Sequence, residues 1–261
     1  MLAAERIRRI KDIIIEYRHI DVNTLSTMLN VSESTIRKDL EKLEQEGFVN
    51  RIYGGAVLNT DENEHALFLD NTDPFIDEKR KIGEIASKLI IDNDVIFLGM
   101  GSVCTQIAKN LTGINLTIIT NNISAIVELV SNPNNTAHII GTGGDITTDN
   151  RCIGFEGKFA IDFLEGILIN KAFLTVDGFS IKNGYTVNSK EQVAFYNVLK
   201  KISEEIIIVA DYSKANKTAM LKLDSITSIR KIVSNENILN EYKKFFYDSE
   251  IQLFTTIGTA I

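Results

Sequence analysis

Apolar residues recur at every third or fourth position through the first 45 residues, which is the spacing of amphipathic helices. This spacing predicts two helices, over residues 3–17 and 21–30. Ser32 is a good candidate N-cap for a third helix. The apolar stripe of that third helix consists of Ile36, Leu40 and Leu43.

A turn and a wing are expected after the third helix. Gly47 is a candidate C-cap, and residues 48–57 have the pattern of two short strands. Gly54 and Gly55 lie between these strands and allow the backbone to bend sharply. The first 58 residues are therefore expected to form a winged helix–turn–helix, the class of domain that places a helix in the major groove of DNA.

The outward side of the third helix carries side chains that suit DNA. Short hydroxyls and cations can bond phosphate oxygens and base edges, and an arginine in the wing can reach a phosphate or the minor groove. The candidate DNA-binding residues are Ser32, Ser34, Thr35, Arg37, Lys38 and Arg51. The alternative for the same side chains is an ordinary solvated helix face.

Strand and helix patterns alternate in the rest of the chain. Continuous apolar strands are expected at residues 95–98, 116–120, 137–140, 172–176, 206–210, 231–233 and 252–254. Helices are expected from residue 77 onward and at 105–111, 123–130, 159–164, 191–202 and 238–246. This alternation predicts an α/β domain, residues 76–261, with a mostly parallel sheet covered on both faces. The polar, acidic residues 59–75 are expected to form a linker.

Small and polar residues gather where these strands end. Ligands of such sheets bind beyond the carboxyl ends of the strands, and a helix that begins there offers free N–H groups to an anion. The candidate ligand-binding residues at the strand ends are Gly99, Gly101, Ser102, Thr105, Thr120, Asn121, Gly143, Gly144, Asp177, Asp211 and Lys214. Each loop alone has a simpler interpretation as a tight turn, but five such loops at one edge favour a ligand site.

Charge and cysteine content narrow the function. The chain has a net charge of −7, yet residues 1–58 hold nine basic and nine acidic residues, so the whole excess lies in residues 59–261. DNA contact is therefore expected to depend on local cations, Arg6, Arg8, Arg9, Arg37, Lys38 and Arg51. The two cysteines, Cys104 and Cys152, have no metal or disulfide spacing, and no apolar run could span a bilayer, so a cytoplasmic protein without metal or cofactor is expected.

The first domain resembles the DeoR family of bacterial transcription regulators. The resemblance rests on Val31-Ser32, on Thr35 to Leu40, on Leu43-Glu44, on Gly47 and Arg51, and on Gly54-Gly55-Ala56. Lys38 departs from the family, which usually has a second arginine there, and it lacks the planar fork of a guanidinium. The resemblance implies a DNA-binding regulator.

The second domain resembles the effector domain of the same family, which is related to ribose-5-phosphate isomerase and glucosamine-6-phosphate deaminase. The matching positions are Lys79, Ile82-Gly83, Gly99 to Thr105, Thr120-Asn121, Gly143-Gly144, Gly154, Asp177-Gly178, Glu191, Ala210-Asp211 and Ser213-Lys214. The resemblance implies that a phosphorylated sugar or polyol binds here, and it adds Glu191 to the candidate site. Phe195-Tyr196 departs from the Lys-Arg that is common in the family, so this helix face is less cationic than usual.

The leading hypothesis is a repressor of a sugar-metabolism operon, without enzymatic activity. It would bind double-stranded operator DNA as a homodimer or homotetramer and respond to a phosphorylated sugar. A second hypothesis is a sugar-phosphate isomerase or deaminase with an appended DNA-binding head, using Asp177, Glu191 and Lys214. A third is a dinucleotide-sensing repressor, although Cys104 occupies the last glycine position of that motif.

Overall fold

The computed structural model describes residues 3–17, 19–45, 47–52, 54–58, 73–149, 152–256 and 259–260. The chain divides into two compact units, residues 1–67 and 68–261, which are described separately. Of the expected linker, residues 59–75, only 73–75 lie within the described ranges.

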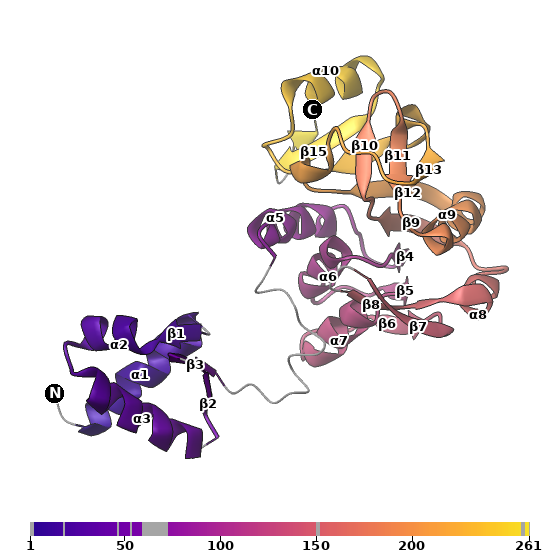
Figure 1. Cartoon of the computed structure of the whole chain (residues 1–261). Coiled ribbons are helices and arrows are strands. Elements are labelled where there is room, and N and C mark those ends of the chain that lie inside the picture. The colour runs from indigo at the N-terminus through magenta and orange to yellow at the C-terminus, as the bar shows by residue number, and fades with distance from the viewer. Residues whose placement is uncertain are drawn as a thin grey trace. The chain divides into compact units, whose positions relative to one another are not determined.

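The first unit has the expected three helices and wing (Figure 1). The helices are α1 (Ala3–Tyr17), α2 (Val22–Leu29) and α3 (Glu33–Gln45). The wing strands β2 (Val49–Ile52) and β3 (Gly55–Leu58) pair antiparallel, and a strand that was not expected, β1 (His19–Asp21), extends the sheet on the other side of β3. The winged helix–turn–helix is thus confirmed.

Local sequence signals set the turns of this unit. Asp21 caps α2 by accepting a hydrogen bond from the N–H of Thr24, and Asn30 ends α2 in the left-handed conformation with φ of 52°. Gly47, with φ of +71°, lets the chain turn from α3 into β2. The apolar sides of the three helices then meet in a core that includes Ile10, Ile14, Leu25, Ile36, Leu40 and Leu43, all essentially without exposure.

One of the expected DNA-facing cations has a structural position instead. The Nε of Arg6 donates to Asp39 Oδ2 at 2.5 Å, and its Nη2 donates to Asp39 Oδ1 at 3.1 Å. Their side chains are only 13% and 10% exposed. The expectation that Arg6 faces DNA is therefore wrong, because its guanidinium ties α1 to the inner side of α3.

Replacing Asp39 by alanine should destabilise the first unit by about 3 kcal/mol, because the buried guanidinium of Arg6 would lose its partner. Hydrogen exchange of the α1 and α3 amides in the full chain measures this local opening. Glu41→Ala, at an exposed position of the same helix, is the matched control and should leave the exchange rates nearly unchanged.

The second unit is built on an eight-stranded sheet in the order β16-β15-β14-β12-β9-β4-β5-β6. Every neighbouring pair is parallel except β15 with β16. The strands are β4 (Val95–Leu98), β5 (Thr117–Thr120), β6 (His138–Gly141), β9 (Ile169–Leu174), β12 (Ser203–Val209), β14 (Lys231–Val233), β15 (Gln252–Thr256) and β16 (Thr259–Ala260). The expected mostly parallel sheet is confirmed.

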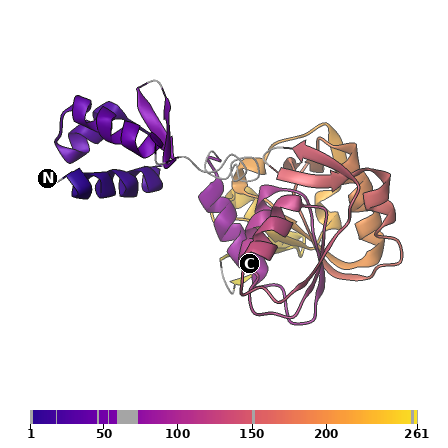
Figure 2. The same cartoon turned by 90° about the horizontal axis from the view of Figure 1, so that it is seen from below.

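Helices cover both faces of this sheet, as Figure 1 and the turned view in Figure 2 show. One face packs against α5 (Ile76–Ser87), α6 (Ser102–Lys109) and α7 (Ile123–Ser131). The other packs against α8 (Gly157–Asp162), α9 (Lys190–Ile202) and α10 (Asn240–Asp248). Alternate residues of one strand serve the two cores: Ile96 and Leu98 belong to the first, and Phe97 to the second.

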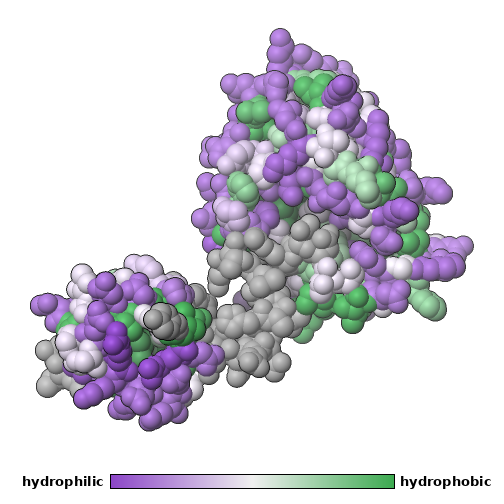
Figure 3. All heavy atoms as spheres, viewed as in Figure 1, coloured by the Kyte–Doolittle hydropathy of each residue, from purple (hydrophilic) through white to green (hydrophobic). Residues whose placement is uncertain are grey.

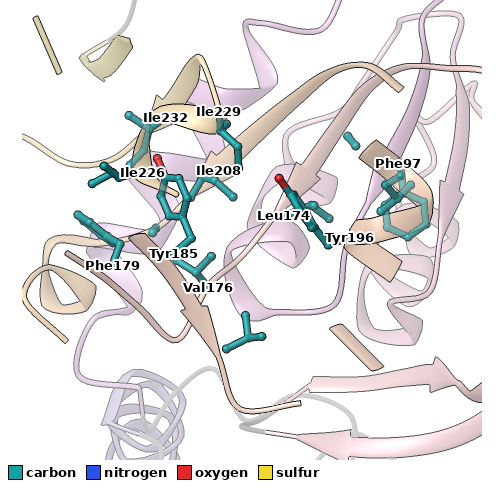
Figure 4. Close-up of a cluster of buried hydrophobic side chains, with 14 of the residues drawn as sticks. Phe97, Leu174, Val176, Phe179, Tyr185, Tyr196, Ile208, Ile226, Ile229 and Ile232 are labelled. Carbon is teal, nitrogen blue, oxygen red and sulfur yellow. The ribbon is translucent and has the colours of Figure 1, made fainter. Parts of the chain in front are cut away.

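Two small antiparallel sheets were not expected. One is the hairpin of β7 (Asp145–Asp149) and β8 (Cys152–Glu156). The other joins β10 (Gly178–Ser180), β11 (Gly184–Val187) and β13 (Leu221–Asp224). The second sheet packs Phe179 and Tyr185 onto the larger core, where Figure 4 shows them near Ile226 and Ile232.

On the face that Figure 3 shows, hydrophilic residues predominate in both units, and hydrophobic residues are exposed in separate patches. Phe159 and Leu168 of the second unit are among the most exposed large apolar side chains. Among the described residues, no helix combines the length and the apolar character needed to cross a lipid bilayer.

Candidate DNA interface and candidate ligand cleft

The third helix and the wing form a groove that is lined by two of the candidate DNA-binding residues. Arg37 comes from α3 and Arg51 from β2, and both line this groove together with Ile52, Gly54 and Gly55. Lys38, next to Arg37 on α3, is exposed to solvent. The structure therefore brings a helix cation and a wing cation to one concave surface.

Both arginines form ion pairs with exposed carboxylates of the first unit. Arg37 Nη2 lies 2.8 Å from Glu33 Oε2, and Arg51 Nη1 lies 3.7 Å from Glu44 Oε2. Exposed ion pairs of this kind contribute little free energy, so a phosphate or a base edge can replace either carboxylate at small cost. Both guanidinium groups therefore stay available to bind DNA.

The hydroxyl candidates lie together at the amino-terminal end of α3. The Ser32 hydroxyl is 3.0 Å from the Ser34 hydroxyl and 2.9 Å from that of Thr35. Ser32 and Ser34 are exposed, and Thr35 is partly buried. Since the amino terminus of a helix carries a partial positive charge, this cluster suits a phosphate oxygen.

An open cleft lies at the carboxyl ends of the central strands of the second unit. Five of the candidate ligand-binding residues line it: Gly101, Ser102, Asp177, Asp211 and Lys214. The remaining lining residues are Lys79, Met100, Val103, Cys152, Thr175, Val176, Gln192, Val209 and Ala210. The expectation that strand ends of this sheet meet at one site agrees with this geometry.

The first wall of the cleft is the turn from β4 into α6. Gly101 is the N-cap of α6, with φ of +135°, a conformation that favours glycine. A Cβ atom at this position would lie 2.6 Å from the Thr175 hydroxyl, which itself donates to the carbonyl of Met100 at 2.8 Å. Glycine thus permits the close approach that leaves the first N–H groups of α6 open to the cleft.

The cations of the cleft differ in their partners. Lys79 donates to Asp73, and both side chains are largely buried. Lys214 lies in the turn Tyr212–Lys214 after β12 and has no ion pair within the described ranges. Lys214 is therefore the cation best placed to meet an anionic ligand.

The two aspartates of the cleft are partly engaged by their own loops. Asp177 Oδ2 accepts from the N–H of Asn188 at 2.7 Å, and Asp211 Oδ1 accepts from the N–H of Ser213 at 2.9 Å. Each carboxylate keeps a second oxygen that can accept from a ligand hydroxyl. Among the described residues, no cluster of three His, Cys, Asp or Glu side chains is arranged to hold a metal ion.

Five other candidates do not line the cleft. The Thr120 hydroxyl, fully buried, donates to the carbonyl of Leu98, and Thr105 donates to that of Gly101, so both support the loop from inside. Gly143 and Gly144 lie in the loop after β6 with positive φ. Glu191 is exposed at the start of α9, where it accepts a hydrogen bond from Ser189.

The residue that organises the loop was not among the candidates. Asn122 donates from Nδ2 to the carbonyls of Gly99 and Gly101 and to the Thr105 hydroxyl, and its Oδ1 caps α7 through Ala125. The sequence carries a signal for the capping role, because asparagine is a preferred N-cap. The sequence carries no signal for the hydrogen bonds from Asn122 to the loop after β4.

A second, small chamber adjoins the cleft, since Met100, Thr175 and Gln192 line both. The remaining two candidates, Gly99 and Asn121, line this inner chamber. Its walls are mainly apolar and also include Phe97, Glu156, Leu174, Val187, Phe195, Tyr196 and Leu223. Figure 4 shows Phe97, Leu174 and Tyr196 in the core around it.

The hydroxyl of Tyr196 bonds to a residue at the end of β13. It donates to Asp224, which also accepts from Lys200 and Ser228. Burial alone would raise the pKa of Asp224, but these hydrogen bonds outweigh it and hold that pKa below its usual range. Burial and the same aspartate raise the pKa of Tyr196. Tyr196 therefore presents its ring, not a free hydroxyl, to the chamber.

Gly101→Ala should lower stability by about 1–3 kcal/mol and weaken anion binding in the cleft, because the new Cβ would collide with Thr175. Calorimetric unfolding and titration with inorganic phosphate measure the two effects. Gly113→Ala is the matched control, since Gly113 also has positive φ (+65°) but nothing within 4 Å of the added Cβ. Equal losses in both variants would mean that the contact with Thr175 is unimportant.

Comparisons with known proteins cover both units. Residues 6–62 match the family model described as DeoR-like helix-turn-helix domain, and residues 75–236 match the DeoR C terminal sensor domain. An uncharacterized HTH-type transcriptional regulator of Bacillus subtilis, YulB, is 31% identical across 97% of this chain and 96% of its own length. The HTH-type transcriptional regulator GolR of Listeria innocua is also 31% identical, across 94% and 96%.

Two further matches are more distant. The HTH-type transcriptional repressor GlcR of Bacillus subtilis is 28% identical across 90% of this chain and 89% of its own length. The solved ribose 5-phosphate isomerase A from Methanocaldococcus jannaschii covers 54% of this chain and 55% of that chain, with 17% identity and a TM-score of 0.38. Similarity at that last level supports no argument about what the chain binds or does.

Proposed function

The chain belongs to the DeoR family of transcriptional regulators, and from this premise we propose that it is a repressor of a sugar-metabolism operon. In this proposal a phosphorylated sugar binds in the cleft of the sensor domain and sets the affinity of the helix–turn–helix for operator DNA. One of the relatives, GlcR, is a transcriptional repressor, which supports repression as the direction of control.

The DNA side of the proposal rests on the groove between α3 and the wing. Arg37 reaches base edges or phosphates from α3, and Arg51 reaches the backbone or the minor groove from β2. Ser32, Ser34 and Thr35 bind phosphate at the start of α3, and Lys38 adds a second cation. Because exposed ion pairs are weak, the carboxylates of Glu33 and Glu44 yield to DNA.

The ligand side rests on one observation: Lys214, without an ion pair among the described residues, lines the same cleft as the start of α6 at Gly101-Ser102. A cation and free N–H groups at a helix amino terminus are complementary to a phosphate. Asp177 and Asp211 accept hydroxyl groups of the sugar.

Two helix–turn–helix units that bind one operator together explain how a ligand in the sensor domain can control DNA binding. A homodimer or homotetramer would read two half-sites about 34 Å apart, one turn of the duplex. The ligand must bind the DNA-competent arrangement and the incompetent one with different affinity, since otherwise it shifts nothing. In a repressor that is released by its ligand, the incompetent arrangement binds the ligand more tightly.

No observation favours the hypothesis of an enzyme with an appended head. That hypothesis needs Asp177, Glu191 and Lys214 to act on one substrate, whereas the Glu191 side chain bonds Ser189 and is not part of the cleft lining. The relatives named above are transcriptional regulators.

Fluorescence anisotropy with a labelled duplex from the promoter of its own operon tests the proposed function. The full chain should bind this duplex at least about 1,000-fold more tightly than a shuffled duplex. Both affinities should fall as salt rises from about 50 to about 200 mM, because bound cations displace the counterions of DNA. Equal affinity for the two duplexes at low salt would refute the proposal.

A further inference from the structure

Two aromatic side chains are exposed on one side of α8, the helix between the β7–β8 hairpin and β9. Phe159 is 81% exposed, and Phe163, the C-cap residue of α8, is 39% exposed. The N–H of Phe163 donates to the carbonyl of Phe159 at 3.0 Å, so the two side chains lie one helical turn apart on the same side. Ala160 and Leu164, in contrast, are fully buried in the core. The core therefore uses Ala160 and Leu164, and the two phenylalanines remain at the surface.

Further apolar side chains are exposed on the elements that adjoin α8. Ile146 lies in β7, which contacts α8, and is 70% exposed. Leu168, in the connection from α8 to β9, is 81% exposed. In the view of Figure 3, hydrophobic residues reach the surface in the part of the second unit where Figure 1 places α8. Single exposed apolar residues are ordinary on a protein surface, whereas several on neighbouring elements indicate a surface that another molecule covers.

A charged pair runs alongside the aromatic pair. Lys158 Nζ lies 2.5 Å from Asp162 Oδ2, one turn further along α8, and the two side chains are 85% and 53% exposed. The outer side of the helix therefore has an aromatic row, Phe159 and Phe163, next to a charged row with its cation near the start and its anion near the end. An apolar centre bordered by polar residues is the usual composition of a protein–protein interface.

This arrangement is complementary to itself. In a two-fold interface the same surface occurs on both chains, and two copies of a helix that crosses the axis at a right angle run antiparallel. Antiparallel copies of α8 set Phe159 of each chain against Phe163 of the other, and Lys158 of each against Asp162 of the other. The net charge of −7 makes two copies repel each other, but this surface pairs one cation and one anion per chain and adds nothing to that repulsion. A second copy of the chain is therefore the occupant that α8 fits best.

We propose that α8 is the centre of a two-fold interface between the second units of two copies of this chain. The phenylalanine rings of both chains form its apolar core, with Ile146 and Leu168 around them, and Lys158 and Asp162 form ion pairs between the chains. Because a stable dimer buries about 800 Å² per chain, parts of β7 and of the connection to β9 belong to the interface as well. The inference rests on the proposed function, in which two heads bind one operator, and it adds which surface joins the two chains.

Replacing Phe159 by aspartate tests the apolar core of this interface. The side chain is exposed and lies in the first turn of α8, where a carboxylate stabilises a helix, so the variant should fold. In sedimentation equilibrium of the full chain, the dissociation constant of the dimer should rise about 100-fold or more, because both chains lose a central aromatic ring. Tyr247→Asp, at a position 69% exposed on α10, is the matched control and should leave that constant unchanged.

The charged row allows a test that does not depend on the stability of α8. Lys158→Asp sets carboxylates of the two chains against each other, and Asp162→Lys does the same with ammonium groups, so each variant alone should dimerise more weakly than the unchanged chain. A mixture of the two variants restores both ion pairs between the chains. Native mass spectrometry of an equimolar mixture should then show heterodimers well above the share of about one half that random pairing gives. The ion pair within the helix cannot cause this preference, since both variants lack it.

Three results would overturn the inference: an unchanged chain that is monomeric at every concentration measured, a dissociation constant that Phe159→Asp does not alter, or random pairing in the mixture. In each case, a preference of the unchanged chain for its promoter duplex would keep the proposed function and exclude only the α8 interface. Conversely, a dimer that dissociates in Phe159→Asp but shows no promoter preference when unchanged would refute the proposed function and keep the interface.

Discussion

Replacing Lys214 by methionine should shift the response of DNA binding to about 10- to 100-fold higher concentrations of a phosphorylated ligand. Lys214 is the cleft cation without an ion pair among the described residues, and a charge-assisted hydrogen bond to phosphate is worth about 1.5–3 kcal/mol. The affinity for the tightest sugar phosphate should therefore fall about 10- to 100-fold. Isothermal titration measures this affinity, and anisotropy of the labelled duplex measures the response.

The same variant should bind operator DNA as the unchanged chain does when no ligand is present, because Lys214 belongs to the second unit and the DNA contacts to the first. Lys244→Met, at an exposed position of α10, is the matched control for the loss of one positive charge. A Lys214→Met protein that kept full ligand affinity would remove Lys214 from the phosphate site.

Replacing Arg37 by alanine should weaken operator binding by about 1–3 kcal/mol for each head, if its guanidinium contacts a guanine. In an oligomer with two heads on one operator the losses add, since the two contacts are far apart. Discrimination between the promoter duplex and a shuffled duplex should fall as well, because a base contact carries sequence information and a phosphate contact does not. Anisotropy titrations against both duplexes measure the two effects.

Lys42→Ala separates this role from simple charge loss. Lys42 lies in the last turn of the same helix, five residues after Arg37, so it is on a different side of α3 and does not line the groove. Its removal should change the operator affinity much less than the removal of Arg37. Equal losses in the two variants would indicate general electrostatic attraction, and discrimination unchanged by Arg37→Ala would remove Arg37 from base recognition.

Most of the first unit could be predicted because its signals are local. Ile36, Leu40 and Leu43 mark the buried side of α3 through their spacing alone, and Gly47 marks its end. Strand β1 could not be predicted, because three residues are too few to show an alternation and its pairing partner, β3, is distant in the chain. The burial of Arg6 had no local signal either, since it depends on Asp39, thirty-three residues away.

The parallel sheet could be predicted because each of its central strands is a continuous apolar run between two helices. The sheet of β10, β11 and β13 could not, since Leu221–Asp224 pairs with Gly184–Val187 across the whole of α9 and β12. Its strands are short, and their register is set by packing against the core around Phe179 and Tyr185.

The candidate cleft was predictable to the extent that strand ends determine it. Gly101 and Ser102 follow β4, Asp177 follows β9, and Asp211 and Lys214 follow β12. They still meet, because parallel strands end at one edge. Thr105 and Thr120 follow the same rule, yet their hydroxyls serve backbone carbonyls inside the loop. Sequence position alone does not distinguish a hydroxyl that donates to the backbone from one that faces a ligand. Gln192 reaches the site from a helix, for which strand ends give no signal.

The central claim is that occupancy of the cleft changes the affinity of the helix–turn–helix for DNA. The most direct measurement is the dissociation constant of the full chain for its promoter duplex, determined with and without a saturating sugar phosphate whose binding has been verified by titration. We expect the two dissociation constants to differ by about 10- to 100-fold, and the duplex to shift the ligand affinity by the same factor, as linkage requires. Two equal dissociation constants, with the ligand demonstrably bound, would contradict the account.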